Sequence, residues 1–111
     1  MEITESKAGT ALIFSLSGRL DATTSGQLEK AVVERVQAGA NRILFDLSKL
    51  EYISSAGLRV LAMTLKQVSA TGGGMALCAL REPVRMVFDV SGFSSYFQIA
   101  ASFDDALVSL S

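Results

Sequence analysis

Hydrophobic and polar positions along the chain follow two periods, one typical of strands and one typical of helices. Residues 11–17 are rich in strand-forming side chains, with Leu12, Phe14 and Leu16 on one face. Residues 41–47 are apolar with little alternation, a pattern typical of a central parallel strand covered on both faces. The segments that we predict as strands are residues 1–6, 11–17, 41–47, 75–80 and 96–100.

Apolar residues that recur every three or four positions predict four helices. The first covers residues 24–38, the second runs from a serine pair at positions 54 and 55 to about residue 70, and the last covers residues 104–110. Pro83 is well placed in the first turn of the third helix, which Gly92 ends. The apolar stripe predicted to face the core from the second helix consists of Leu58, Leu61, Leu65 and Val68.

The order of these elements is β-β-α-β-α-β-α-β-α, which predicts an α/β fold with a mixed, largely parallel β-sheet flanked by helices. The 111 residues suffice for one domain with a sizeable core, and no linker, repeat or low-complexity segment divides them. We therefore expect a single domain over residues 1–111.

Charge and cysteine content narrow the possible partners and compartments. The net charge is −1, from 10 basic and 11 acidic residues, so we expect neither a nucleic-acid nor a membrane partner. Cys78 is the one cysteine, so no intramolecular disulfide can form, and a cytoplasmic location is the simplest interpretation.

The side-chain inventory also excludes several classes of chemistry. The chain has no histidine, so neither a Ser-His-Asp nor a Cys-His nucleophile can be assembled. A histidine zinc site is excluded for the same reason, and one cysteine cannot build a thiolate site. We expect no enzymatic activity, no metal and no cofactor.

The serine pair, Ser54 and Ser55, joins the end of an apolar strand to the start of the second helix. One serine could simply cap the helix, because a hydroxyl accepts a hydrogen bond from an unpaired N–H of the first turn. Alternatively, one serine could accept a phosphate, which the positive end of the helix dipole would favour. Gly57 removes side-chain bulk beside the joint, so we expect a partner to approach Ser55 closely.

Three further side chains, Arg59, Met63 and Lys66, share one face of this helix, off the predicted core stripe. The face could be a solvated basic surface or a docking surface in which Met63 is an adaptable apolar contact.

Two carboxylates, Asp21 and Asp46, lie at the exits of predicted strands, and the chain is predicted to turn out of the strand over residues 41–47 at Asp46-Leu47-Ser48. Each could simply form a cap or turn. Alternatively, both could lie near Ser55, because sites in parallel α/β sheets form beyond the carboxyl ends of the strands.

Several motifs together resemble the STAS domain of bacterial anti-sigma factor antagonists. The resemblance covers nearly the whole chain in the right order. The most specific part of the resemblance is the spacing between the two stretches at residues 45–48 and 52–58. The other parts are the turn at residues 18–21 and the third predicted helix with its end at residues 91–93. These motifs are Phe45-Asp46-Leu47-Ser48, Tyr52-Ile53-Ser54-Ser55-Ala56-Gly57-Leu58, Gly18-Arg19-Leu20-Asp21, Pro83-Val84 with Phe88, and Ser91-Gly92-Phe93.

The resemblance implies a STAS-like fold and a switch between partners. Family members bind an anti-sigma factor that is itself a GHKL-type serine kinase, and phosphorylation of a serine at the helix start dissociates the complex. A PP2C-type phosphatase restores binding. The phosphoacceptor position falls on Ser55, with Ser54 as the alternative. The residues predicted to meet the partner are Asp21, Asp46, Ser54, Gly57, Leu58, Arg59, Met63 and Lys66.

This chain departs from the sporulation branch of the family at two positions. Ser54 stands where that branch has an aspartate, and Arg59 stands where it has a glycine, which makes the helix surface more basic. Other STAS domains are never phosphorylated, so the alternative function is a scaffold or small-ligand module, such as a transporter-associated subunit.

Overall fold

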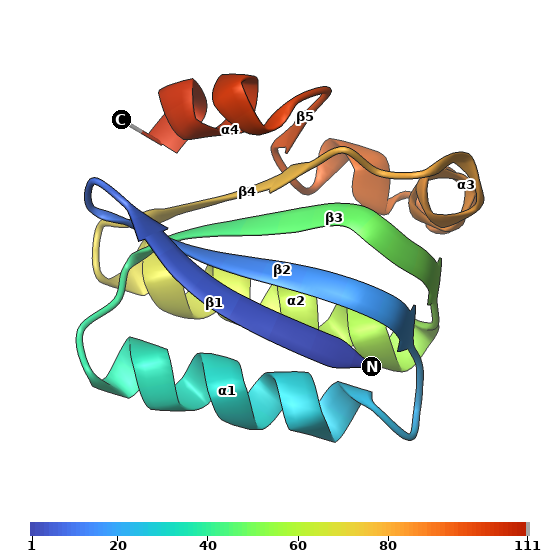
Figure 1. Ribbon diagram of the computed structural model, residues 1–111, viewed down its shortest axis with the longest axis horizontal. Coiled ribbons are helices and arrows are strands. Elements are labelled where there is room, and N and C mark those ends of the chain that lie inside the picture. Colours follow the sequence, from blue (N-terminus) through green and yellow to red (C-terminus); the bar gives the residue numbers. More distant parts are fainter. Residues whose placement is uncertain (111) are drawn as a thin grey trace.

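Five strands form one sheet in the computed structural model, which describes residues 1–110 (Figure 1). Their spatial order equals their order in the chain, with the first pair antiparallel and the other three pairs parallel. The predicted mixed, largely parallel sheet is therefore confirmed. The strands are β1 (Glu2–Ala8), β2 (Ala11–Leu20), β3 (Arg42–Ile53), β4 (Gly74–Cys78) and β5 (Ile99–Ala100).

Helices cover the two faces of the sheet unequally. Two helices, α1 (Ser25–Gln37) and α2 (Ser55–Ala70), lie side by side under one face, and α4 (Phe103–Leu110) lies over the other (Figure 1). The remaining helix, α3 (Glu82–Ser91), contacts β3. Parallel strands need such crossover helices, and here α2 and α4 both contact β3 and β4.

The side chains of the central strands differ in size between the two faces. Phe14 of β2 and Phe45 of β3 stack on the face that α1 and α2 cover, with ring centroids 5.5 Å apart. Toward α4 the strands present a smaller apolar cluster, in which Leu44 and Cys78 are fully buried. Residues 43–45 are thus apolar on both faces because both faces of this part of β3 are covered.

The prediction that the chain leaves the third strand at Asp46 is wrong. Ser15 pairs with Asp46 and Ser17 pairs with Lys49, so β3 carries one residue more than β2 between these pairs. An extra residue of this kind makes a β-bulge, in which the strand bends but continues. Oδ1 of Asp46 accepts a hydrogen bond from the N–H of Ser48 at 3.0 Å, which stabilises the bulge locally. The strand therefore continues to Ile53.

The predicted strand over residues 96–100 is also mostly wrong. Phe93–Ser95 form a short 3₁₀ helix, and only Ile99–Ala100 pair with β4. The rings of Phe93, Tyr96 and Phe97 contact one another, and Phe97 meets Phe88 of α3 at 5.7 Å. Packing among aromatic rings therefore fixes this segment, and strand pairing begins only beyond it.

Candidate functional site

The serine pair lies where β3 ends and α2 begins, and its two members have different surroundings. Ser54 is half-buried, and its hydroxyl accepts a hydrogen bond from the N–H of Gly57 at 3.4 Å, so Ser54 is the N-cap. Its own N–H donates to the carbonyl of Leu20 at 2.9 Å. The start of α2 is thereby fixed to the end of β2.

Ser55 is the first residue of α2, and its side chain is exposed. Within residues 1–110 its hydroxyl makes no hydrogen bond. The first turn contains no acidic residue. Ser55 therefore offers a free hydroxyl at the positive end of a helix dipole.

Gly57 has a different role from the one predicted. It is buried, and a Cβ atom there would lie 2.7 Å from Cγ of Leu20 and 2.9 Å from Cγ1 of Ile53. The missing side chain lets α2 approach the ends of β2 and β3; it does not open space for a partner. Leu58 is only 3% exposed and belongs to the core. Both residues were predicted to meet the partner, and their burial argues against direct contact.

The predicted surface face of α2, made of Arg59, Met63 and Lys66, is present in part. Arg59 and Lys66 are exposed, and both are basic. Met63 is half-buried and packs against the core beneath them. Because α2 has no acidic residue at all, its exposed surface is cationic on a chain whose net charge is −1.

Asp21 lies in the loop that follows β2, beside the Ser54 joint. Its Oδ1 accepts hydrogen bonds from the hydroxyl of Thr23 at 2.7 Å and from the N–H groups of Thr23 and Thr24. The Thr23 hydroxyl is the main cause that lowers the pKa of Asp21 below its ordinary value. The carboxylate therefore stabilises the turn into α1, as its turn-forming interpretation predicts.

Sequence reasoning missed a pair of residues next to this turn. The guanidinium of Arg19 lies 4.3 Å from the ring centroid of Tyr52, and Nε of Arg19 lies 3.7 Å from Oδ2 of Asp21. The side chain of Tyr52 is 37% exposed. The available signal was a tyrosine two residues before the serine pair. Arginine and tyrosine are enriched among the residues that dominate binding energy at interfaces.

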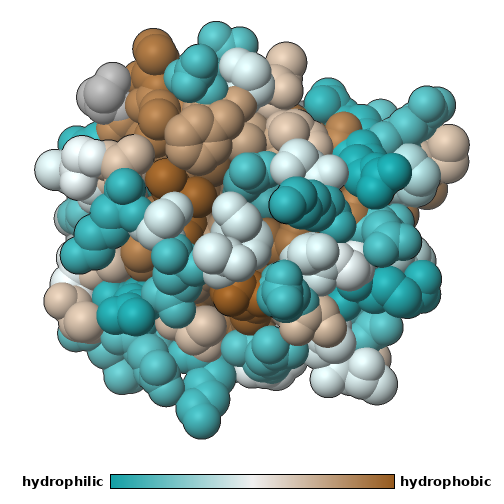
Figure 2. All heavy atoms as spheres, viewed as in Figure 1, coloured by the Kyte–Doolittle hydropathy of each residue, from teal (hydrophilic) through white to brown (hydrophobic). Residues whose placement is uncertain are grey.

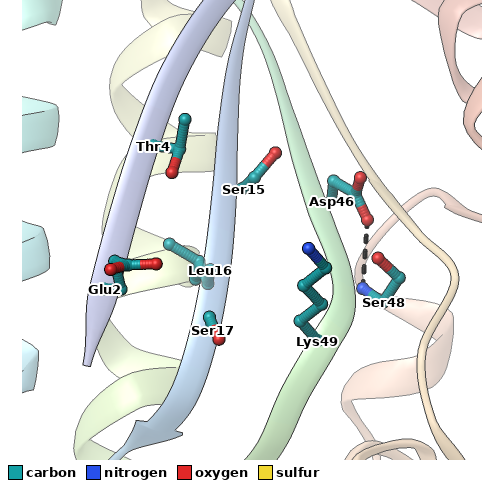
Figure 3. A pocket seen from close by; sticks show the side chains of 8 residues that line it. All are labelled: Glu2, Thr4, Ser15, Leu16, Ser17, Asp46, Ser48 and Lys49. Carbon is teal, nitrogen blue, oxygen red and sulfur yellow. Dashed lines mark hydrogen bonds between the residues drawn. The ribbon is translucent and has the colours of Figure 1, made fainter.

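Asp46 does not join Asp21 near Ser55. It pairs with Ser15 of β2, five residues before Leu20, so it lies ~16 Å along the sheet from the serine joint. It belongs instead to a shallow pocket of about 120 Å³ on the part of the sheet that α4 leaves open (Figure 3). The pocket is lined by Glu2, Thr4, Ser15, Leu16, Ser17, Asp46, Ser48 and Lys49. The alternative that brought both carboxylates to Ser55 is thus wrong.

Other exposed apolar side chains lie outside α2. On α3, Met86 and Val90 are 57% and 84% exposed, four residues apart. Figure 2 shows a second apolar area at its upper left, over α4 and the β1–β2 turn. A hollow there is lined by Ala8, Gly9, Thr10, Ala11, Leu107 and Leu110.

No group of three or more histidine, cysteine, aspartate or glutamate side chains is placed to hold a metal ion among residues 1–110. None of the helices in this part of the chain is long and apolar enough to cross a membrane.

The fold agrees with comparisons to known proteins. Residues 2–106 match the family model of the STAS domain, so the chain belongs to the STAS domain family. It is 41% identical over 102 residues to BtrV of Bordetella bronchiseptica, a candidate anti-sigma factor antagonist, with 92% of this chain and 88% of BtrV covered. It is 33% identical over 100 residues to the anti-sigma F factor antagonist of Paenibacillus polymyxa, with 89% and 83% covered.

A solved structure supports the fold alone. The Bacillus cell fate determinant SpoIIAA in its phosphorylated form superposes with a TM-score of 0.75 at 19% identity, over 99% of this chain and 100% of that chain.

Proposed function

We propose that this chain is an anti-sigma factor antagonist that binds an anti-sigma factor while Ser55 is free and releases it when Ser55 carries a phosphate. Relatives at 41% and 33% identity bear the name of such antagonists. The observation that carries the proposal is the exposed hydroxyl of Ser55 at the first position of α2, beside a cationic helix surface.

The surroundings of the serine pair favour Ser55 over Ser54 as the acceptor. Ser54 is half-buried and its hydroxyl caps the helix, so a phosphate there would replace a hydrogen bond that holds the joint. Ser55 is exposed and has no such bond within residues 1–110. A phosphate on Ser55 adds about −1.5 to −2 charges where the helix dipole favours them, so the fold tolerates it.

Phosphorylation would weaken the binding of the partner and leave the fold of this chain unchanged. In an interface, the new charge would lose its hydration and oppose any carboxylate placed to meet Arg59 or Lys66. The proposed switch therefore needs no conformational change in this chain.

In the proposed reaction this chain is a substrate and a binding protein. The partner is an anti-sigma factor of the GHKL serine-kinase type. As Oγ of Ser55 bonds to the γ-phosphorus of ATP, the bond from that phosphorus to the bridging oxygen breaks. ADP leaves, and the hydroxyl proton passes to a base of the kinase. A PP2C-type phosphatase then hydrolyses the phosphoester. The proposal includes a cytoplasmic location, where transcription is regulated.

Mass spectrometry tests the modification directly. The protein is isolated from its native cell, its intact mass is measured, and the segment over residues 50–65 is fragmented. A phosphate on Ser55 supports the proposal, whereas a phosphate on Ser54 moves the site. Absence of phosphate under every growth condition contradicts the switch.

Binding to a purified serine-kinase anti-sigma factor tests the consequence. Ser55→Asp is expected to weaken binding about 30-fold or more, because a charge is left desolvated in the interface. Ser55→Ala should bind as wild type does. Ser6→Asp, an exposed serine on β1, is the matched control for added charge. Equal binding by Ser55→Asp and wild type would count against the proposal.

A further inference from the structure

Ser55 and Arg59 are neighbours on the surface of α2. They lie four positions apart in the sequence, which places them one above the other on the same helix face, with Cβ atoms about 5–6 Å apart. Both side chains are exposed. Side chains on a helix lean toward its N-terminus, so Arg59 leans toward Ser55.

Among the residues that the structure describes, Arg59 has no competing ion-pair partner. Other arginines of the chain form ion pairs: Arg35 with Glu5 at 2.6 Å and Arg85 with Asp89 at 3.4 Å. Within residues 1–110 Arg59 forms no ion pair. No acidic residue lies anywhere on α2, so none on its own helix would compete for the guanidinium.

We infer that Arg59 binds the phosphate of phosphorylated Ser55. The inference rests on the proposed phosphorylation and adds the residue that receives its charge. A guanidinium matches two phosphate oxygens at once, which a lysine cannot do. An anion N-terminal to a cation at this spacing is also the more favourable orientation on a helix.

The pairing changes what phosphorylation does to the docking surface. With Ser55 free, Arg59 is available to a carboxylate of the partner. With Ser55 phosphorylated, the same guanidinium is held by its own helix. One modification therefore adds negative charge and removes the nearest cation. Lys66, eleven residues from Ser55, lies ~16 Å along the helix and is too distant to take part.

Phosphorus NMR of a protein made with phosphoserine at position 55 tests the pairing without a kinase or a partner. The second pKa of phosphoserine, about 6, is measured from the chemical shift during a pH titration. Because a neighbouring cation favours the dianion, Arg59→Gln should raise this pKa by about 0.3 unit or more. Arg59→Lys should raise it by less, since the charge is kept and the planar fork is lost.

Lys66→Gln is the matched control, because it also removes one exposed cation from α2. Its titration should overlay that of the parent phosphoprotein. An unchanged pKa in Arg59→Gln would overturn the inference, as would equal shifts in Arg59→Gln and Lys66→Gln. Absence of phosphate in the native cell would instead remove the proposed function and leave the measured pairing standing.

Discussion

At the scale of single residues, the serine joint divides two tasks between neighbours. Ser54 caps the helix and ties it to Leu20, while Ser55 stays exposed. A residue that holds the joint can be modified only at a cost to the fold, whereas its exposed neighbour can be modified freely. With two adjacent serines, one can stabilise the start of α2 while the other stays accessible to a modifying enzyme.

Gly57 shows how packing sets the identity of a residue in the same segment. The space for its side chain is already filled by Leu20 and Ile53. Alanine at this position must push these two buried side chains, or the helix itself, away from the contact.

We predict that Gly57→Ala lowers the free energy of unfolding by about 1–3 kcal/mol, the range typical of overpacked cores. Urea denaturation monitored by circular dichroism measures it. Gly26→Ala on α1 is the control, because a Cβ atom there meets nothing within 4 Å. The control should be neutral or slightly stabilising, since alanine has the higher helix propensity. Equal effects of the two substitutions would refute the packing role.

At the scale of elements, α2 follows the predicted stripe and extends it. Leu58, Leu61 and Val68 are buried as predicted, and Leu65 is half-buried. Val60 and Thr64 are buried as well. The buried surface is wider than one stripe because α2 packs against both the sheet and α1.

Leu61 tests this arrangement, because it is fully buried at the centre of the stripe. We predict that Leu61→Ala costs roughly 2–5 kcal/mol of stability, through lost burial and the cavity left behind. Met86→Ala on the exposed face of α3 should change the stability by less than about 0.5 kcal/mol. The two variants are compared in one chemical-denaturation series; a nearly neutral Leu61→Ala would contradict the packing of α2.

At the scale of the whole molecule, Cys78 reports on the layer between the sheet and α4. It is fully buried in the smaller apolar cluster. Burial, together with the nearby charge of Asp46, raises the pKa of its thiol from 9.0 to about 11. The reactive thiolate is therefore suppressed in the folded protein.

We predict that a thiol reagent at pH 8 labels Cys78 only as fast as the protein opens. The rate should rise with added urea, and because the chain has one cysteine the signal is unambiguous. As a control, Met86→Cys in a Cys78→Ala background should be labelled at the rate of a free thiol.

The pH dependence of stability has a definite sign. The unfolded thiol ionises near its ordinary pKa of 9.0, and the pKa of the folded thiol is raised to about 11. Between these values the unfolded state binds fewer protons, so stability should fall as the pH rises. The labelling prediction would be contradicted if Cys78 at pH 8 without urea were labelled as fast as the exposed Met86→Cys control, because Cys78 would then be accessible in the folded protein.

The sequence by itself determined the class of fold and the position of the serine joint. Local burial produces the alternation in residues 11–17, the apolar run within residues 41–47 and the apolar stripe of α2, so the chain displays them directly. The single cysteine and the absence of histidine excluded whole classes of chemistry without any coordinates.

Only the tertiary structure decided what depends on contacts between distant segments. The bulge at Asp46 follows from the register against β2, and the burial of Gly57 follows from Leu20, 37 residues earlier in the chain. The Arg19–Tyr52 contact likewise joins two strands. Local patterns cannot reveal these features, because each depends on a partner that only folding brings near.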